Sequence, residues 1–149
     1  MRTSGHARPV ERAVAAFSKL GEHGALWVGI SAAGAALDRE RRGEFLEAGR
    51  TVAVSFVANQ AVKLLVRRRR PELPGLPPIV HTMSNRTYPS AHATTSAAGA
   101  RALSSLLPPG PLYAVAVALA LSRPYLGVHY PSDTLAGAAL GAAVAELRR

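Results

Sequence analysis

The sequence predicts an all-α fold, a transmembrane bundle of about five core helices preceded by one amphipathic helix. Hydrophobic residues make up 48% of the chain, yet aromatic residues make up only 5%. This composition, dominated by alanine, favours closely packed helices over a β-sandwich, which uses more β-branched and aromatic side chains. A chain of 149 residues suits one compact unit, so we expect a single domain over 1–149.

The N-terminal segment, residues 1–22, is expected to contain the amphipathic helix. Over 9–20, the apolar Val10, Val14 and Phe17 alternate with charged side chains at roughly helical spacing. Such a helix lies on a membrane surface or packs on a soluble core. The segment has no long apolar run and no small-residue cleavage pattern, so no removable signal peptide is expected.

Five predominantly apolar segments follow and are expected to form the core helices: 24–37, 51–66, 91–107, 112–122 and 134–145. A bilayer core needs about 20 apolar residues per helix, so these shorter segments must use flanking residues to cross it. Gly137 and Gly141 have the GxxxG spacing that lets two helices approach closely. The charged run 38–42 marks a loop, and the proline-rich segment 67–90 is the longest loop, which we expect to border the functional site.

Composition limits the classes of partner. The formal net charge of +9 favours anionic partners, such as phosphate esters, acidic lipids or nucleic acids. The chain has no cysteine, which excludes disulfides, thiolate nucleophiles and zinc sites with cysteine ligands. Charge alone does not choose among the anions, so the choice depends on polar motifs at the ends of the predicted helices.

The first motif closes the second core segment. Lys63 and Arg70 are seven residues apart, about two helical turns, so they share one face and can converge on one anion. A lysine in an apolar helix is costly without a partner or ligand, which makes Lys63 a site candidate. Arg67, Arg68 and Arg69 are instead expected to be solvated or to lie against lipid headgroups.

The second motif precedes the third core segment. Ser90 is a good N-cap, and the free backbone N–H groups of the helix start form an anion site near His92. Taken alone, Ser90 is better explained as a plain helix cap, and a histidine in a first helical turn is common. His81, which lies outside every motif, is expected to matter little.

The third motif joins the fourth and fifth core segments and places Arg123, His129 and Asp133 within 11 positions. A histidine four residues before an aspartate can donate one ring N–H to that carboxylate, which leaves the other ring nitrogen free to attack. The alternative is that Asp133 or Ser132 is an ordinary helix cap to which His129 merely bonds.

Together the three motifs resemble the signature of the type 2 phosphatidic acid phosphatase family: KxxxxxxRP, PSGH and SRxxxxxHxxxD. The matching residues are 63–71, 89–92 and 122–133, and every spacing inside a motif agrees. One position differs, because Ala91 stands where the family usually has glycine. A helical φ makes alanine acceptable at that position, so we expect activity to survive.

The resemblance implies a phosphatase that uses no metal and no cofactor and works through a phosphorylated histidine. His129 would attack phosphorus, His92 would protonate the departing alkoxide, and Asp133 would orient His129. The implied phosphate-binding residues are Lys63, Arg70, Ser90, Ala91 and Arg123. In physical terms, several cations at the equatorial phosphate oxygens can take the place of magnesium.

The resemblance also implies that the substrate is a lipid phosphomonoester: phosphatidate, phosphatidylglycerophosphate or a polyprenyl-linked phosphate such as decaprenylphosphoryl phosphoribose phosphate. The expected protein is integral to a bacterial cell membrane and has no nucleic-acid partner; its oligomeric state and the side that carries the site are left open. The alternatives are a polyprenyl-diphosphate phosphatase, a vanadium-dependent haloperoxidase of the same superfamily, and a non-enzymatic basic membrane protein that binds acidic lipids or nucleic acid.

Overall fold

The computed structural model describes residues 6–72, 75, 77–82 and 84–148. These residues form six α-helices and one 3-10 turn, and they contain no β-strand: α1 Arg8–Lys19, η1 Glu22–Gly24, α2 Ala25–Leu37, α3 Arg42–Val66, α4 Ala91–Leu103, α5 Pro109–Tyr125 and α6 Pro131–Leu147. The all-α prediction is therefore confirmed. Residues 1–5 of the expected N-terminal segment, and residues 73, 74, 76 and 83 of the expected long loop, lie outside the described residues.

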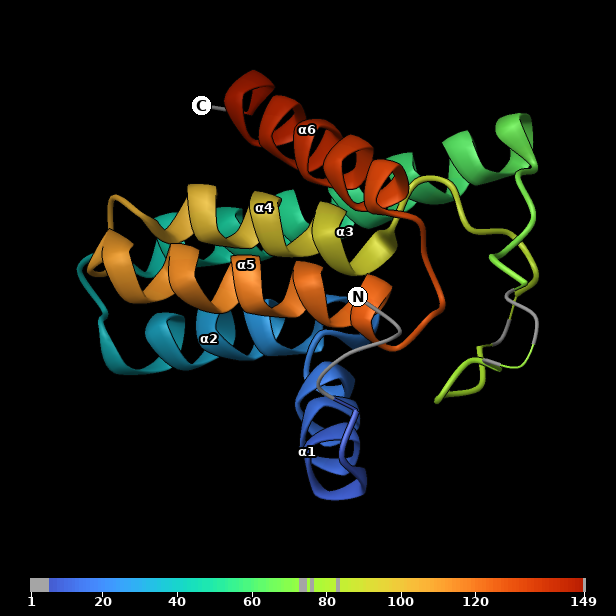
Figure 1. The fold of residues 1–149 in the computed structure, drawn as a ribbon. Helices are drawn as coiled ribbons and strands as arrows, with labels where there is room; N and C mark the ends of the chain where they lie inside the picture. Colours follow the sequence, from blue (N-terminus) through green and yellow to red (C-terminus); the bar gives the residue numbers. More distant parts are fainter. Residues whose placement is uncertain (1–5, 73–74, 76, 83, 149) are drawn as a thin grey trace.

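Helix α4 is the centre of the bundle, because α3, α5 and α6 all pack against it. Helix α2 packs on α3, and α1 projects away from the bundle below α2 and contacts α5 (Figure 1). Large apolar side chains fill the space between the helices, including Trp27, Phe45, Val52, Leu103 and Leu119. Each of these is at most 2% exposed, so the bundle has an apolar core despite its many small residues.

Helices α4 and α6 approach closely because glycine faces backbone there. A Cβ atom on Gly141 would lie 2.0 Å from the carbonyl oxygen of Thr94, and one on Gly137 would lie 2.5 Å from that of Ser90. The close approach predicted from the GxxxG spacing is therefore confirmed. It presses the first turn of α4 against the first turns of α6, and these two turns carry predicted site residues.

Several helix boundaries differ from the prediction. Helix α3 begins at Arg42 rather than at residue 51, because Phe45, Ala48 and Val52 are buried at helical spacing while the charged residues between them face outward. Helix α4 ends at Leu103 rather than at residue 107. Helix α5 continues to Tyr125 through Pro124, since a proline in the last turn interrupts few further hydrogen bonds.

The outer surface of the bundle carries exposed aliphatic side chains. Val57 and Leu65 of α3 are 66% and 81% exposed, and Leu135 of α6 is 72% exposed. Among the described residues, however, no helix combines the length and the apolarity that crossing a bilayer requires.

Candidate active site

The predicted site residues lie at one end of the bundle, where the long loop leads into α4 and where α5 joins α6 (Figure 1). They come from several elements: Lys63 of α3, Arg70 of the long loop, Ser90, Ala91 and His92 at the start of α4, Arg123 of α5, His129 after α5, and Asp133 of α6. Arg70 Nη1 donates to the Val128 carbonyl oxygen at 2.6 Å, and the Ser90 N–H donates to the Asp133 carbonyl oxygen at 2.9 Å. The first and second motifs are thus both hydrogen-bonded to the third.

His129 does not contact Asp133 in the way the sequence predicts. Its Nδ1 atom lies 3.6 Å from Asp133 Oδ2, too far for a good hydrogen bond, but only 2.9 Å from Thr87 Oγ1. Thr87 Oγ1 in turn donates to Asp133 Oδ2 at 2.6 Å. The expected direct bond between His129 and Asp133 is therefore wrong in detail, because a hydroxyl from the end of the long loop is hydrogen-bonded to both of them.

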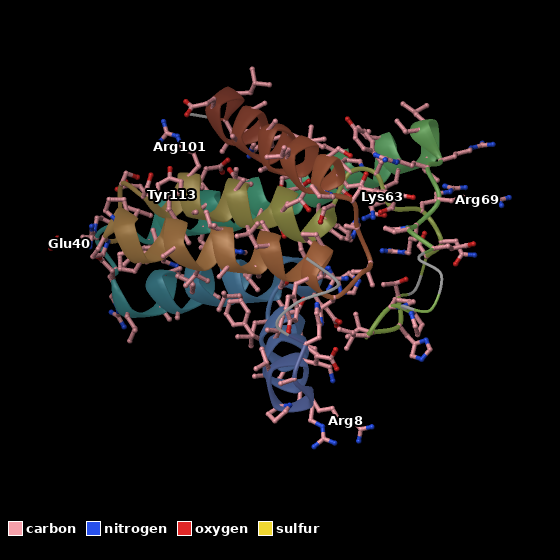
Figure 2. The ribbon with its side chains drawn as sticks, in the orientation of Figure 1. Arg8, Glu40, Lys63, Arg69, Arg101 and Tyr113 are labelled. Carbon is pink, nitrogen blue, oxygen red and sulfur yellow. The ribbon has the colours of Figure 1, made fainter. Side chains whose placement is uncertain are left out.

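Asp133 is fully buried and accepts further hydrogen bonds. The Tyr130 N–H donates to its Oδ2 at 2.9 Å, as in an N-terminal helix cap, and Arg68 Nη1 donates to its Oδ1 at 2.9 Å. The prediction for Arg68 was thus wrong, since its guanidinium forms an ion pair with a buried carboxylate. The expectation for Arg69 fits better, because it lies at the outer edge of the long loop (Figure 2).

His92 is buried beneath the C-terminal end of α1. Its Nε2 lies 3.0 Å from the carbonyl oxygen of Ser18, and because a carbonyl only accepts, Nε2 carries the proton. The hydroxyl of the same serine accepts from Arg123 Nη1 at 2.8 Å. Helix α1 therefore covers the site through Ser18 and touches two of the predicted functional side chains.

Ser90 occupies the N-cap position of α4, yet its side chain forms no capping hydrogen bond. Its Oγ is buried and has no partner among the described residues, and the same is true of Arg123 Nε. Buried polar atoms are usually paired, because an unpaired one costs about 1–3 kcal/mol. The explanation of Ser90 as a plain cap is therefore not supported, and both atoms lack the hydrogen-bond partner that such burial ordinarily requires.

The site is strongly cationic. The pKa of the His129 imidazole is lowered to about 4, first by burial and then by the positive charges of Arg70, Arg123 and Lys63, while the nearby Asp133 carboxylate opposes this lowering. Burial also lowers the pKa of the Arg70 guanidinium, against the opposing charge of Asp133. His129 is thus neutral near pH 7, as a nucleophile requires, and it lies among cations suited to a phosphate.

Comparison with known proteins identifies the family that carries this arrangement. The model of the PAP2 superfamily matches residues 44–148, which contain all three motifs. The chain belongs to the PAP2 superfamily. The predicted resemblance is therefore confirmed, and so is the phosphatase function.

Two mycobacterial relatives of this PAP2 protein are named decaprenylphosphoryl-5-phosphoribose phosphatase. The protein from Mycobacterium tuberculosis is 42% identical over 131 residues, which cover 85% of this chain and 72% of the relative. The protein from Mycolicibacterium smegmatis is 41% identical over 123 residues, which cover 82% of this chain and 68% of the relative.

Two crystal structures resemble the PAP2 chain closely. The transmembrane PAP2-type phosphatidylglycerolphosphate phosphatase of Bacillus subtilis has a TM-score of 0.76 and 25% identity, over 96% of this chain and 76% of that one. Aquifex aeolicus LpxE has a TM-score of 0.82 and 20% identity, over 99% of this chain and 88% of that one, and it supports the fold alone.

A pocket of about 270 Å³ opens beside the predicted phosphate-binding residues of this PAP2 protein, between α1 and the long loop. Its lining residues are Ala15, Ser18, Lys19, Glu22, Val80, His81 and Arg123. Because Ser18 and Arg123 also belong to the hydrogen-bonded group around His92, the pocket adjoins the candidate site. His81, expected to matter little, lies in the wall of this pocket, where sequence motifs gave no signal.

Proposed function

We propose that this phosphatase hydrolyses a lipid phosphomonoester through a phosphohistidine formed at Nε2 of His129. The observation that carries the proposal is the pair of buried, unpartnered atoms, Ser90 Oγ and Arg123 Nε, which come from different motifs. Phosphate oxygens would satisfy both atoms, and Lys63 and Arg70 would add positive charge. Such preorganised donors stabilise the charge on a transferring phosphoryl group.

In the first step, His129 Nε2 attacks phosphorus in line with the ester oxygen. The P–N bond forms as the P–O bond breaks, and His92 transfers a proton to the departing alkoxide. His92 must carry both ring protons at that moment, a state that the bound phosphate dianion favours. The Ser18 carbonyl oxygen, 3.0 Å from Nε2, holds this ring in place before the transfer.

In the second step, water attacks the phosphohistidine. His92 has given up a proton and is now neutral, so it can accept one from the attacking water. The P–N bond breaks, inorganic phosphate forms, and His129 returns to its neutral state. The cationic groups keep the phosphoryl group in place through both steps, so the reaction asks for no metal ion.

The leaving group of the proposed reaction would enter the pocket between α1 and the long loop. Its oxygen must reach His92, whose ring nitrogen already contacts Ser18 at the edge of this pocket. Lys19, Glu22 and His81 offer both donors and acceptors, which suits hydroxyl groups better than an acyl chain. The proposed substrate is therefore a polyprenyl-linked sugar phosphate, in keeping with the names of the mycobacterial relatives.

We further propose that the protein acts within a bacterial membrane. Two observations support this setting: the exposed aliphatic side chains of the bundle, such as Leu65 and Leu135, and the description of the Bacillus relative as a transmembrane protein. Apolar side chains exposed to water are unfavourable in free energy, and a bilayer would cover them. The lipid chain of the substrate would then lie alongside the helices, with the phosphate at the end of the bundle.

Phosphate release by the purified full-length protein tests the proposed function. The assay compares phosphatidate, phosphatidylglycerophosphate and a polyprenyl-phosphoryl sugar phosphate, with EDTA present throughout. Fastest release from the sugar phosphate is expected, with loss in His129→Ala and retention in Arg69→Gln, whose side chain lies at the outer edge of the loop. Equal release by native protein and His129→Ala would contradict the proposed mechanism.

Two pocket variants separate the substrate proposal from the reaction itself. Lys19→Ala and His81→Ala should raise KM for the sugar phosphate about tenfold and leave phosphatidate hydrolysis unchanged, because only the sugar fills the pocket. If both substrates respond equally to the pocket variants, the pocket does not bind the leaving group.

A further inference from the structure

Thr87 holds a central position that none of the three motifs assigns to it. The side chain is fully buried at the end of the long loop, and its Oγ1 contacts His129 Nδ1 at 2.9 Å and Asp133 Oδ2 at 2.6 Å. A threonine hydroxyl has one proton to donate and two lone pairs to accept with. It can therefore donate to only one of its two close neighbours.

The carboxylate decides where that proton goes. Besides Thr87, Asp133 accepts from the Tyr130 N–H and from Arg68 Nη1, both at 2.9 Å, so a cationic donor holds Oδ1 and neutral donors hold Oδ2. A carboxylate held in this way stays ionised and can only accept. The Val128 carbonyl oxygen, at 3.4 Å from Thr87 Oγ1, is too distant to compete with a contact of 2.6 Å.

The hydroxyl proton therefore goes to Asp133, and the oxygen is left as an acceptor for the ring of His129. We propose that Thr87 is a positioning residue that fixes the tautomer of His129: Nδ1–H donates to the threonine, and Nε2 keeps the lone pair that attacks phosphorus. The negative charge of Asp133 acts on the ring through the hydroxyl. When the phosphohistidine forms, Nδ1–H remains in place, so the chain of hydrogen bonds survives the reaction.

Arg68 holds this chain from its far side. Its guanidinium bonds Asp133 and Ser132 and lies over the Tyr130 ring, 4.0 Å from the ring centroid. Its carbonyl oxygen accepts the N–H of Thr87 at 2.9 Å. One residue thus fixes both the backbone of the bridging threonine and the carboxylate to which it donates, which makes Arg68 a second positioning residue.

Replacement of Thr87 tests the role of the hydroxyl. Thr87→Val keeps the shape of the side chain but removes the hydroxyl, and Thr87→Ser keeps the hydroxyl. This inference rests on the proposed role of His129, since loss of an orienting group matters only if that ring attacks. In Thr87→Val, kcat should fall on the order of 10²-fold with KM nearly unchanged, whereas Thr87→Ser should stay within about threefold of native.

Outcomes that contradict the inference are distinct from failure of the proposed function. If His129→Ala is inactive and Thr87→Val remains fully active, the threonine does not position the ring, although the nucleophile stands. Equal loss in Thr87→Ser and Thr87→Val at equal melting temperature would also overturn the role of the hydroxyl. Activity in His129→Ala would instead overturn the proposed function.

Neighbouring arginines supply a matched pair for the second residue. Arg68→Gln should lower kcat about tenfold and leave KM nearly unchanged, because Asp133 keeps its bonds to Thr87 and Tyr130. Arg69→Gln removes the same charge from the adjacent position and should not change kcat. If both substitutions change kcat equally, Arg68 acts only through the net charge of the protein and is not a positioning residue.

Discussion

His92 Nε2 lies 3.0 Å from the backbone carbonyl oxygen of Ser18, so the proposed proton donor is held by the helix that covers the site. The contact comes from backbone and does not depend on the serine side chain. It gives α1 a role beyond that of an amphipathic surface helix, because its C-terminal end determines where the His92 ring points.

Gly21, just after α1, tests this relationship. A Cβ atom there would lie 2.8 Å from His92 Cδ2, and the backbone of Gly21 has ordinary dihedral angles, so Gly21→Ala acts through crowding. The displaced ring should lower kcat about tenfold, since small misplacements of catalytic groups are costly. Gly29→Ala is the control, because its Cβ meets nothing within 4 Å, and it should leave kcat unchanged.

Ser90→Ala should separate stability from activity. The Ser90 hydroxyl is buried without a partner, so its removal should leave the melting temperature unchanged or raise stability by up to about 1 kcal/mol. The same change should lower kcat/KM on the order of tenfold, because a phosphate donor is lost. Reduced stability with normal kcat/KM would instead favour the helix-cap explanation.

The lowered pKa of His129 predicts a pH-dependent stability. The folded protein binds this proton only near pH 4, whereas the unfolded chain binds it near the ordinary pKa of 6.5. Between these values the unfolded state holds more protons, so the neutral ring's contribution is present above pH 6.5 and lost as pH falls to about 4. The total is on the order of 3 kcal/mol.

His129→Gln isolates this contribution. Thermal unfolding measures the stability of both proteins. As the pH falls from 6.5 to 4, the native protein should lose stability faster than His129→Gln. Above pH 6.5 the two proteins should change at equal rates. Parallel losses in both proteins would show that His129 is protonated with an ordinary pKa.

The contact between α4 and α6 predicts a strong response to one methyl group. Gly141→Ala would place Cβ 2.0 Å from the Thr94 carbonyl oxygen, so the helices must separate, which should cost about 1–3 kcal/mol of unfolding free energy. Gly43→Ala is the control, since its Cβ would meet open space. Chemical denaturation of both variants measures the difference, and equal stability would contradict the close packing.

Local spacing explains why much of the site was predictable. Lys63 and Arg70 lie two helical turns apart, and His92 follows an N-cap position, so each motif sets its own geometry. The order of the helices then brings the motifs to one end of the bundle. The all-α class followed from composition in the same way.

Long-range contacts explain what the sequence did not reveal. Thr87 ends a proline-rich loop with no periodic pattern, and its role depends on Asp133, 46 positions later in the chain. Arg68 lies in a run of four arginines, where the ordinary expectation is solvation. The run gave no sign that Arg67 ends α3 in the left-handed conformation. The sequence feature that could have drawn attention to Thr87 is its position three residues before Ser90 of the second motif.

The most direct test of the account is to trap the phosphorylated enzyme. Native protein and His129→Ala are mixed with a radiolabelled lipid phosphate, quenched in alkali within the first turnovers, and digested for mass spectrometry. We expect an acid-labile phosphate on the peptide that contains His129 and none on the corresponding peptide of His129→Ala. Label on another residue, or rapid phosphate release by His129→Ala, would contradict the phosphohistidine mechanism.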